Sequence, residues 1–439
     1  MIDFRRTLEK ELLNWKNRPG RQPLIVRGAR QVGKTHLLKE FGKNHFEDCA
    51  CFNFEKTDEI KDVFQKTKDI SRILQELSVI RHRSITSNTL LIFDEIQECK
   101  EALNALKYFH EDAPEYPVVA AGSLLGVALK ENKQGFPVGQ VEFLNLYPLN
   151  FLEYLWTADS KLYQFVQNIS SAETIPLLLF NTLREKFSQY SICGGMPAVA
   201  ATMISQIDIE NTERKLNNVR ESFILDFSKH SKPSDVAKIN HVWNSIPSQL
   251  ARENKKFLYQ VVKPGARARE FENALEWLEL SGLVTKVYRT KAPRIPLGHY
   301  DDLSSFKLYL VDIGVLRSQS RIDPSVLIHP NDLYTEFKGA FSENYVLQSL
   351  LSQFDPPRYW TSLSDAEIDF LIQYKNAIIP IEVKSSESVQ NKSLTYYRKD
   401  LSPSLSIRYS WKNLEYNDGL LNIPFFLADK TRDLVGKYV

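Results

Sequence analysis

Residues 28–35 of the chain read GARQVGKT and follow directly after the apolar run PLIV at residues 23–26. The stretch matches the phosphate-loop pattern GxxxxGK[ST] at every specified position, with an expected strand before it and an expected helix, THLLKEFGKNHF, after it. Gly28 and Gly33 let the backbone curl so that successive N–H groups point at phosphate oxygens, and the helix adds the positive end of its dipole. The stretch therefore predicts a nucleotide-binding loop between a strand and a helix.

Every residue of this loop is expected to help bind the nucleotide cofactor, ATP or GTP. The expected nucleotide-binding residues are Gly28, Ala29, Arg30, Gln31, Val32, Gly33, Lys34 and Thr35. The ammonium group of Lys34 is the expected catalytic contact to the β- and γ-phosphates, and the hydroxyl of Thr35 is an expected ligand of Mg²⁺.

Two later apolar runs, LLIFDE at residues 90–95 and PVVAAGS at residues 117–123, end in polar side chains. Asp94 is placed to hold Mg²⁺ through water, and Glu95 is the candidate general base for the attacking water. Ser123 is expected to contact the γ-phosphate or that water. The competing interpretation is a chance loop match followed by an ordinary Asp-Glu pair, and the order and spacing of the motifs argue against it.

The apolar runs of the first part of the chain favour a parallel α/β sheet. CACFNFE at residues 49–55 and the three runs above are expected strands that alternate with loops and helices, as in βαβ units. Residues 1–16 predict an amphipathic helix. Residues 151–220 read as mainly helical. The helices of residues 235–289, with a strand after Gly282, suggest a winged-helix module.

Composition sets outer bounds on the class of protein. The chain has 439 residues, 43% hydrophobic and 25% charged, with a net charge of +2, which is ordinary for globular domains and gives no global basic surface. The longest apolar run, PVVAAGSLLGVAL, is too short to span a bilayer. The four cysteines form no CxxC pair and no Cys/His cluster, which argues against zinc and disulfides. We therefore expect a cytoplasmic protein with no membrane partner.

Several stretches of the chain resemble the AAA-type ATPases of bacteria and archaea that carry a DUF4143 region, the AAA_14/DUF4143 family. They are GARQVGKT, LLIFDEIQ, AAGSLLGV, FPVGQVEFLNLYPLNFLEYL, ICGGMPAV, IPSQLARENKKFLYQ, ARAREFENALEWLELSGLV and LYLVDIGVL, and they extend over nearly the whole chain. The resemblance implies an α/β fold class: a P-loop AAA+-like parallel sheet with a helical lid, a winged-helix segment and a C-terminal restriction-endonuclease-like α/β domain. The implied ranges are 1–160 for the ATPase core, 161–228 for the lid, 229–300 for the winged-helix-like part and 301–439 for the PD-(D/E)xK nuclease-like domain.

The chain departs from this family at one position. Relatives often carry a basic residue after the glycine of FPVG, where this chain has Gln140. The sequence therefore does not identify which arginine contacts the nucleotide phosphate. Arg30 and Arg220 are candidates, although each is more typical of a surface or structural arginine. A homo-oligomer is one of the oligomeric states that the sequence allows.

Glu343, Asp369, Glu382 and Lys384 form a second candidate site. A glutamate on a helix, an aspartate in AEIDFLI and the ExK of PIEVKSS resemble the PD-(D/E)xK nuclease core. In that chemistry the three carboxylates bind Mg²⁺, and Asp369, Glu382 and Lys384 are the catalytic candidates, with the lysine positioning a water. Glu382 and Lys384 are two apart on a strand, so they project from one face. The competing interpretation is chance, because charges near strand ends are common.

A basic stretch, KKFLYQVVKPGARARE at residues 255–270, lies in the winged-helix-like range. Its five cations are Lys255, Lys256, Lys263, Arg267 and Arg269. Such a stretch could contact DNA phosphates, and the competing interpretation is a solvated face of a packing module.

These observations favour a Mg²⁺-dependent ATPase that couples its nucleotide state to DNA binding or cleavage by a nuclease-like domain. The alternative is an ATP-dependent signalling or scaffold switch whose nuclease-like domain only binds a protein or nucleic-acid partner. A signalling ATPase that needs no nucleic acid is the third hypothesis.

Overall fold

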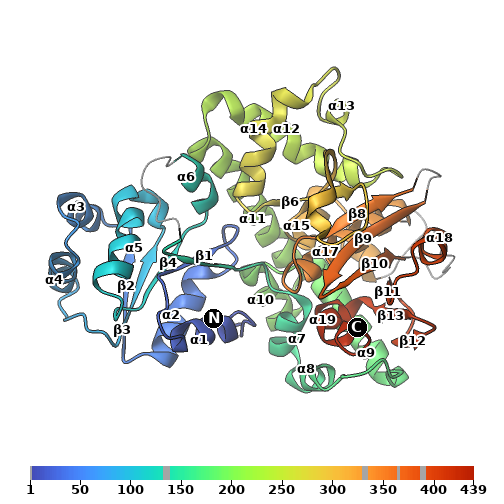
Figure 1. The fold of residues 1–439 in the computed structure, drawn as a ribbon, viewed down its shortest axis with the longest axis horizontal. Helices are drawn as coiled ribbons and strands as arrows, with labels where there is room; N and C mark the ends of the chain where they lie inside the picture. Colours follow the sequence, from blue (N-terminus) through green and yellow to red (C-terminus); the bar gives the residue numbers. More distant parts are fainter. Residues whose placement is uncertain (1, 132–138, 329–334, 363–365, 386–391) are drawn as a thin grey trace. The chain divides into compact units, whose positions relative to one another are not determined.

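The computed structural model describes residues 2–131, 139–328, 335–362, 366–385 and 392–439 (Figure 1). Tertiary contacts divide the chain into two compact units. The P-loop unit comprises Arg5–Pro148 and Leu280–Leu283, and the larger unit comprises Met1–Phe4, Leu149–Glu279 and Val284–Val439. The finer division into four ranges stays a prediction.

The P-loop unit is built on a five-stranded sheet in which every neighbouring pair is parallel, in the order β2-β3-β4-β1-β5. Its strands are β1 (Leu24–Arg27), β2 (Asp48–Asn53), β3 (Thr89–Asp94), β4 (Val118–Ala121) and β5 (Glu142–Asn145). Its helices are α1 (Glu9–Asn17), α2 (Lys34–His45), α3 (Asp58–Lys66), α4 (Ile70–Ile80), η1 (Ile96–Glu98), α5 (Lys100–Asp112) and α6 (Leu125–Glu131). The parallel α/β sheet and its first four strands are confirmed. The edge strand β5 was not predicted, because its side chains are exposed or half-buried and give no apolar run.

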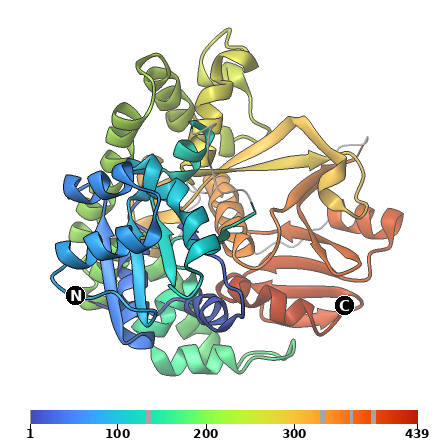
Figure 2. The same cartoon turned by 60° about the vertical axis from the view of Figure 1, so that its left-hand side comes forward.

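Helices cover both faces of this sheet (Figure 2). On one face Phe93 packs its ring 5.5 Å from Phe64 and 5.7 Å from Phe109, which belong to α3 and α5. On the other face α2 approaches so closely that a Cβ on Gly42 would lie 2.6 Å from the Cys49 sulfur and 3.2 Å from Leu90. Burial on both faces explains why β3 is apolar along its length.

The N-terminal helix begins later than the sequence predicts. We expected a helix over residues 1–16, and α1 spans Glu9–Asn17. The guanidinium of Arg6 donates to the carbonyl oxygens of Val32 (2.8 Å) and Tyr147 (2.6 Å), which fixes the segment before α1 against the phosphate loop instead of in a helical turn.

The larger unit combines many helices with an eight-stranded mixed sheet. Its helices are α7 (Phe151–Ala158), α8 (Ser160–Gln167), α9 (Leu177–Cys193), α10 (Pro197–Gln206), α11 (Ile209–His230), α12 (Pro233–Leu250), α13 (Tyr259–Val262), α14 (Ala268–Leu280), η2 (Leu297–Tyr300), α15 (Ile313–Gln319), α16 (Ser325–Ile328), α17 (Thr335–Leu351), α18 (Lys392–Leu401), η4 (Phe425–Lys430) and α19 (Thr431–Val435). Its strands are β6 (Val284–Thr290), β7 (Asp301–Leu310), β8 (Arg358–Thr361), β9 (Glu367–Tyr374), β10 (Ala377–Val383), β11 (Ser406–Ser410), β12 (Glu415–Asn417) and β13 (Leu420–Pro424).

The strands of this sheet follow the order β12-β13-β11-β10-β9-β8-β6-β7 (Figure 1). The pairs β10–β11, β11–β13 and β6–β8 are parallel, and the other pairs are antiparallel. The predicted helices followed by a hairpin are observed as α12, α13 and α14 before the β6–β7 hairpin. Because β6 also pairs with β8, this hairpin is continuous with the sheet of the last part of the chain. The winged-helix interpretation therefore stays a prediction.

The glycine pair in ICGGMPAV serves a close backbone approach in the larger unit. Gly194 has φ +67°, and a Cβ there would lie 2.3 Å from Oδ1 of Asp312. The buried Asp312 carboxylate accepts from the backbone N–H groups of Gly195 (2.6 Å) and Val315 (3.0 Å). Burial disfavours the charged form of Asp312 and raises its pKa to about 6. The backbone hydrogen bonds act in the opposite direction and stabilise the buried carboxylate.

Within the described residues, no helix combines the length and the apolarity that a bilayer crossing needs.

Candidate functional site

The phosphate loop requires glycine at the two positions that its pattern specifies. Gly28 has φ +152°, and a Cβ there would lie 2.1 Å from the carbonyl oxygen of Leu146. Gly33 has φ +94° and immediately precedes α2, which begins at Lys34. Any other residue at these positions would clash with backbone or adopt a strained conformation. The loop therefore ends at a helix N-terminus, where backbone N–H groups can bind an anion.

Lys34 is buried inside this loop, with 6% of its surface exposed. Its ammonium group donates to the carbonyl oxygens of Gly28 and Ala29, at 2.8 Å each, and lies 3.4 Å from Oγ of Ser123. Burial lowers the pKa of Lys34 to about 8, against the opposing influence of the Glu95 and Asp94 carboxylates. The lysine is thus held among neutral acceptors, which phosphate oxygens can replace.

Thr35 and Asp94 meet at the carboxyl edge of the sheet. The Thr35 hydroxyl donates to Oδ1 of Asp94 at 2.9 Å. The other carboxylate oxygen accepts from Nδ2 of Asn53 at 2.9 Å. A hydroxyl and a carboxylate side by side are oxygen donors of the kind that Mg²⁺ prefers. The structure therefore brings together the two residues predicted to hold this ion.

Glu95 lies directly after β3 in a left-handed backbone conformation, with φ +51°. Its Oε2 accepts from Nε2 of Gln97 at 2.7 Å, and its Oε1 lies 3.4 Å from the Ser123 hydroxyl. Ser123 is therefore 3.4 Å from both the Lys34 ammonium and the Glu95 carboxylate. The predicted catalytic residues Lys34, Glu95 and Ser123 converge on one small volume.

Three residues near this site were missed by the sequence analysis. Asn53 and Gln97 hold the two acidic side chains, and Gln97 is packed so that a Cβ on Gly122 would lie 2.1 Å from its Oε1. Gly282, from the segment Leu280–Leu283 of the same unit, has φ +73°, and its Cβ would lie 3.3 Å from the backbone nitrogen of Ala29. The strand-end position of Asn53 was the only signal for any of them. The Gln97–Glu95 hydrogen bond depends on the local turn after β3, and the Gly282–Ala29 contact joins distant parts of the chain.

The candidates for a phosphate-contacting arginine remain unassigned. Gln140 donates to Glu111 at 2.6 Å, and the residues FPV before Gly139 lie outside the described residues. Arg220 donates to the carbonyl oxygen of Ser318 at 3.3 Å and pairs with Glu221 at 3.2 Å, within the larger unit. Its partners fit the structural interpretation of this arginine.

In the larger unit the four residues of the second candidate site also come together. Glu343 lies on α17, Asp369 on β9, and Glu382 on β10 with Lys384 directly after it. Oδ2 of Asp369 accepts from the backbone N–H of Val383 at 2.8 Å, and Lys384 pairs with Glu382. Oε2 of Glu382 is buried with no hydrogen-bond partner. The predicted convergence of helix and strands is observed.

Lysines, however, already neutralise much of this cluster. Glu343 pairs with Lys255, lies 4.0 Å from the fully buried Lys307 and accepts from the Tyr309 hydroxyl at 3.1 Å. Burial and the nearby Glu343 and Glu382 carboxylates raise the pKa of Asp369 well above its usual range. Among the described residues, no group of three or more His, Cys, Asp or Glu side chains is arranged to hold a metal ion. In this arrangement the Glu343 carboxylate is paired with lysine and is not left open to a cation.

The basic stretch at residues 255–270 divides into two parts. Lys255 turns inward to Glu343, and the buried Phe257 stacks on Phe306 with ring centroids 5.2 Å apart. Lys263, Arg267 and Arg269 are exposed, and no ion pair joins them to a carboxylate of the described residues. Only this second part resembles a phosphate-binding surface.

Residues 20–155 match the family model of an AAA domain, AAA_14. Residues 184–326 and 338–426 match two domains of unknown function, DUF8612 and DUF4143. The AAA and DUF4143 matches agree with the resemblance noted in the sequence, and the DUF8612 match was not expected. No curated protein matches the chain.

Among solved structures the chain is similar to a Walker-type ATPase of Pyrococcus abyssi, with 15% identity and a TM-score of 0.47, covering 72% of this chain and 96% of that chain. It is also similar to the ORC2 protein of Aeropyrum pernix in ADPNP-ADP complexes, with 11% identity, a TM-score of 0.36 and coverages of 76% and 92%. For Cdc6p from Pyrobaculum aerophilum the identity is 11%, the TM-score 0.26 and the coverages 79% and 97%.

These TM-scores are low, so the classification rests on the family match and on the loop itself. Residues 20–155 contain the phosphate loop, Asp94, Glu95 and the parallel strands β1 to β5. This part of the chain is an AAA-type P-loop ATPase domain.

Proposed function

We propose that the ATPase domain binds ATP with Mg²⁺ at residues 28–35 and hydrolyses it with Glu95 as the general base. The observation that carries this proposal is the position of the Ser123 hydroxyl, 3.4 Å from both the Lys34 ammonium and the Glu95 carboxylate. A γ-phosphate seated on the loop would lie between the cation that binds it and the base that faces its attacking water.

The side chains supply three actions on the bound nucleotide. Lys34 exchanges the carbonyl oxygens of Gly28 and Ala29 for β- and γ-phosphate oxygens. Glu95, oriented by Gln97, accepts a proton from the attacking water at Oε1. Ser123 donates its hydroxyl to the γ-phosphate or to that water. Thr35 and Asp94 would hold Mg²⁺, which supplies positive charge to the phosphate oxygens when it is bound.

Substitution of the two central residues separates binding from hydrolysis. Lys34→Ala should abolish detectable ATP binding, because no other cation is buried in the loop. Glu95→Gln should retain binding and lose about 100-fold or more in turnover, because it removes only the base. Fluorescent-nucleotide binding and steady-state phosphate release check both. Lys43→Ala, on the exposed side of the same helix, should match wild type. Equal turnover in all four proteins would rule out these roles.

The lowered pKa of Lys34 predicts a pH dependence of ATP binding. The charged form of Lys34 predominates below pH 8 and is lost above it, so affinity should decrease with increasing pH. Between pH 7 and 9 the dissociation constant of a non-hydrolysable ATP analogue should rise about tenfold, with uptake of about half a proton at pH 8. Titration calorimetry in two buffers of different ionisation enthalpy measures both. A constant affinity without proton uptake would contradict this ionisation.

We further propose that the nucleotide state of this domain controls DNA binding by the larger unit. The support for coupling is chain connectivity: the chain leaves the larger unit after Glu279, contributes Leu280–Leu283 to the P-loop unit, and returns to the larger unit at Val284. Gly282 in that segment lies against Ala29 of the phosphate loop. Movement of the loop on ATP binding would therefore act directly on the connection between α14 and β6.

A substitution that adds a single methyl group at position 282 tests this coupling. Gly282→Ala places a Cβ 3.3 Å from the Ala29 nitrogen, so it should weaken ATP binding several-fold and reduce the effect of ATP on DNA binding. Gly20→Ala is a matched control, because Gly20 has a similar φ, +68°, and no atom within 4 Å of its Cβ position. Titrations of ATP and DNA with both variants give the comparison. Identical behaviour of the two variants would remove the coupling route.

The support for DNA as the partner is the exposed group Lys263, Arg267 and Arg269. Replacing all three by alanine should weaken DNA binding and reduce the slope of log affinity against log salt by about one unit for each lost phosphate contact. Lys161→Ala, on the exposed surface of α8, is the charge control. Gel shifts at several salt concentrations measure the slope. Absence of salt-sensitive binding by wild type would favour the signalling ATPase that needs no nucleic acid.

Lysine pairing within the carboxylate cluster supports binding without cleavage. Plasmid incubated with Mg²⁺ or Mn²⁺ should therefore be nicked no faster by wild type than by Asp369→Ala. Nicking by wild type that Asp369→Ala abolishes would instead establish the nuclease hypothesis, and it would require Lys255 to withdraw from Glu343.

A further inference from the structure

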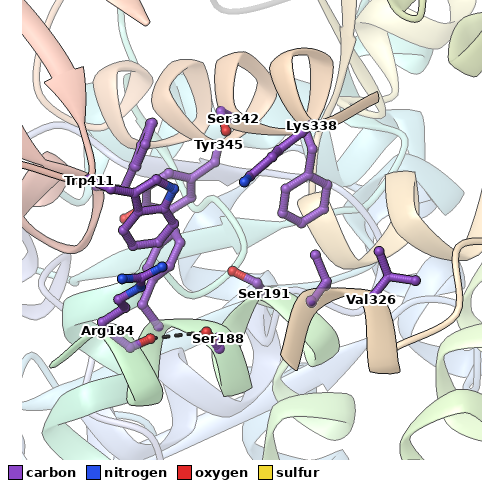
Figure 3. Close-up of a pocket in the computed structure, with 12 residues that line it drawn as sticks. Arg184, Ser188, Ser191, Val326, Lys338, Ser342, Tyr345 and Trp411 are labelled. Carbon is purple, nitrogen blue, oxygen red and sulfur yellow. Dashed lines mark hydrogen bonds between the residues drawn. The ribbon is translucent and has the colours of Figure 1, made fainter. Parts of the chain in front are cut away.

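A cavity of about 100 Å³ lies in the larger unit (Figure 3), and its described lining includes no residue of the carboxylate cluster or of the exposed basic group. Helices α9, α16 and α17 form three of its sides, and Trp411 and Phe425, after β11 and β13, form the rest. Apart from Leu327, its described lining residues fall within the two ranges that match domains of unknown function, residues 184–326 and 338–426.

Aromatic rings make up the body of the cavity. Phe187 contacts Tyr345 and Trp411 edge to face, with centroids 4.7 and 5.7 Å apart, and Trp411 contacts Phe425 at 5.1 Å. Phe187, Tyr345 and Phe425 are buried, so their packing fixes the shape of the wall. An apolar cavity of about 150 Å³ binds a single benzene ring. This cavity, at about 100 Å³, is smaller and has room for part of one planar ring.

Among the described residues, two cations, Arg184 and Lys338, and no carboxylate line the same space. The Arg184 guanidinium lies 5.0 Å from the centroid of the Trp411 ring, and Lys338 extends from α17 toward the open space (Figure 3). No ion pair joins either cation to a carboxylate in the part of the chain that the structure describes. Two positive charges beside an aromatic wall match an anion that carries a ring.

Hydroxyl groups complete the lining between the rings and the cations. Ser188 donates to the carbonyl oxygen of Arg184 at 3.1 Å, within α9. The Ser191 hydroxyl, on a residue 3% exposed, points into the space in Figure 3. Such a group can meet a polar atom on the edge of a ring.

From this lining we propose that the cavity binds a small anion with a single planar ring, the ring lying against Phe187 and Trp411 and the anionic group between Arg184 and Lys338. Aromatic carboxylates and pyrimidine mononucleotides share this chemistry. None of its described lining residues belongs to the ATPase site or to the exposed basic group proposed to bind DNA.

Titration calorimetry on the full-length Lys34→Ala protein tests the proposal, because that background removes nucleotide binding to the phosphate loop. The probes are benzoate, benzamide, uridine 5′-monophosphate, uridine and inorganic phosphate. Benzoate or uridine 5′-monophosphate should bind, about tenfold or more tighter than its neutral counterpart, because a charge-assisted hydrogen bond is lost in the neutral compound. Which of the two anions binds tighter identifies the source of the ring.

Variants then locate the binding. Arg184→Gln and Lys338→Gln should each weaken it about tenfold, and Ser191→Leu should abolish it by filling the cavity. Lys186→Gln, on α9 but outside the cavity lining, should have no effect. Because Arg184 is exposed, Arg184→Gln should fold even if Ser191→Leu does not. The proposal is overturned if neither anion binds at millimolar concentration, if neutral compounds or phosphate bind equally well, or if Arg184→Gln and Lys338→Gln bind like Lys186→Gln.

Discussion

The phosphate loop is organised around a buried charge, the ammonium group of Lys34. Burial of a charge is costly unless hydrogen bonds replace its solvation. Here the loop supplies two of its own carbonyl oxygens, from Gly28 and Ala29. The backbone can turn those oxygens inward only because it adopts conformations that glycine permits at positions 28 and 33. The same backbone conformation therefore sets the shape of the loop, the start of α2 and the position of the Lys34 ammonium group.

Both units bury lysine, but they balance its charge in different ways. Lys34 is bonded to neutral carbonyl groups, so its charge is available to an incoming phosphate. Lys307, fully buried in the larger unit, faces Glu343 and Glu367. A lysine already paired with carboxylates gains little from a further anion, and those carboxylates are not left for a cation. The first arrangement is built for ligand exchange, and the second is balanced within itself.

Close backbone approaches connect segments that are far apart in the sequence. Gly282 lies against Ala29 within the P-loop unit, and Gly194 lies against Asp312 within the larger unit. Each is a contact that a Cβ would disturb, and each occurs where the chain turns with positive φ. A substitution or movement at one member of such a pair displaces the other, because closely packed backbone has little free space. This is the physical basis for linking the phosphate loop to the α14–β6 connection.

The sequence by itself predicted the phosphate loop and four of the five strands of its sheet, and it singled out Asp94, Glu95 and Ser123, whose roles stay predictions. Local rules suffice there, because a glycine pattern and apolar strands followed by polar ends are readable without tertiary contacts. The tertiary structure alone decided that Gln97 orients Glu95, that Gly282 touches the loop and that Lys255 and Lys307 occupy the carboxylate cluster. It also decided where the ring-lined cavity forms. Except for the local Gln97–Glu95 hydrogen bond, these features join residues from separate elements, and no sequence period records which lysine reaches which carboxylate once the strands and helices have packed.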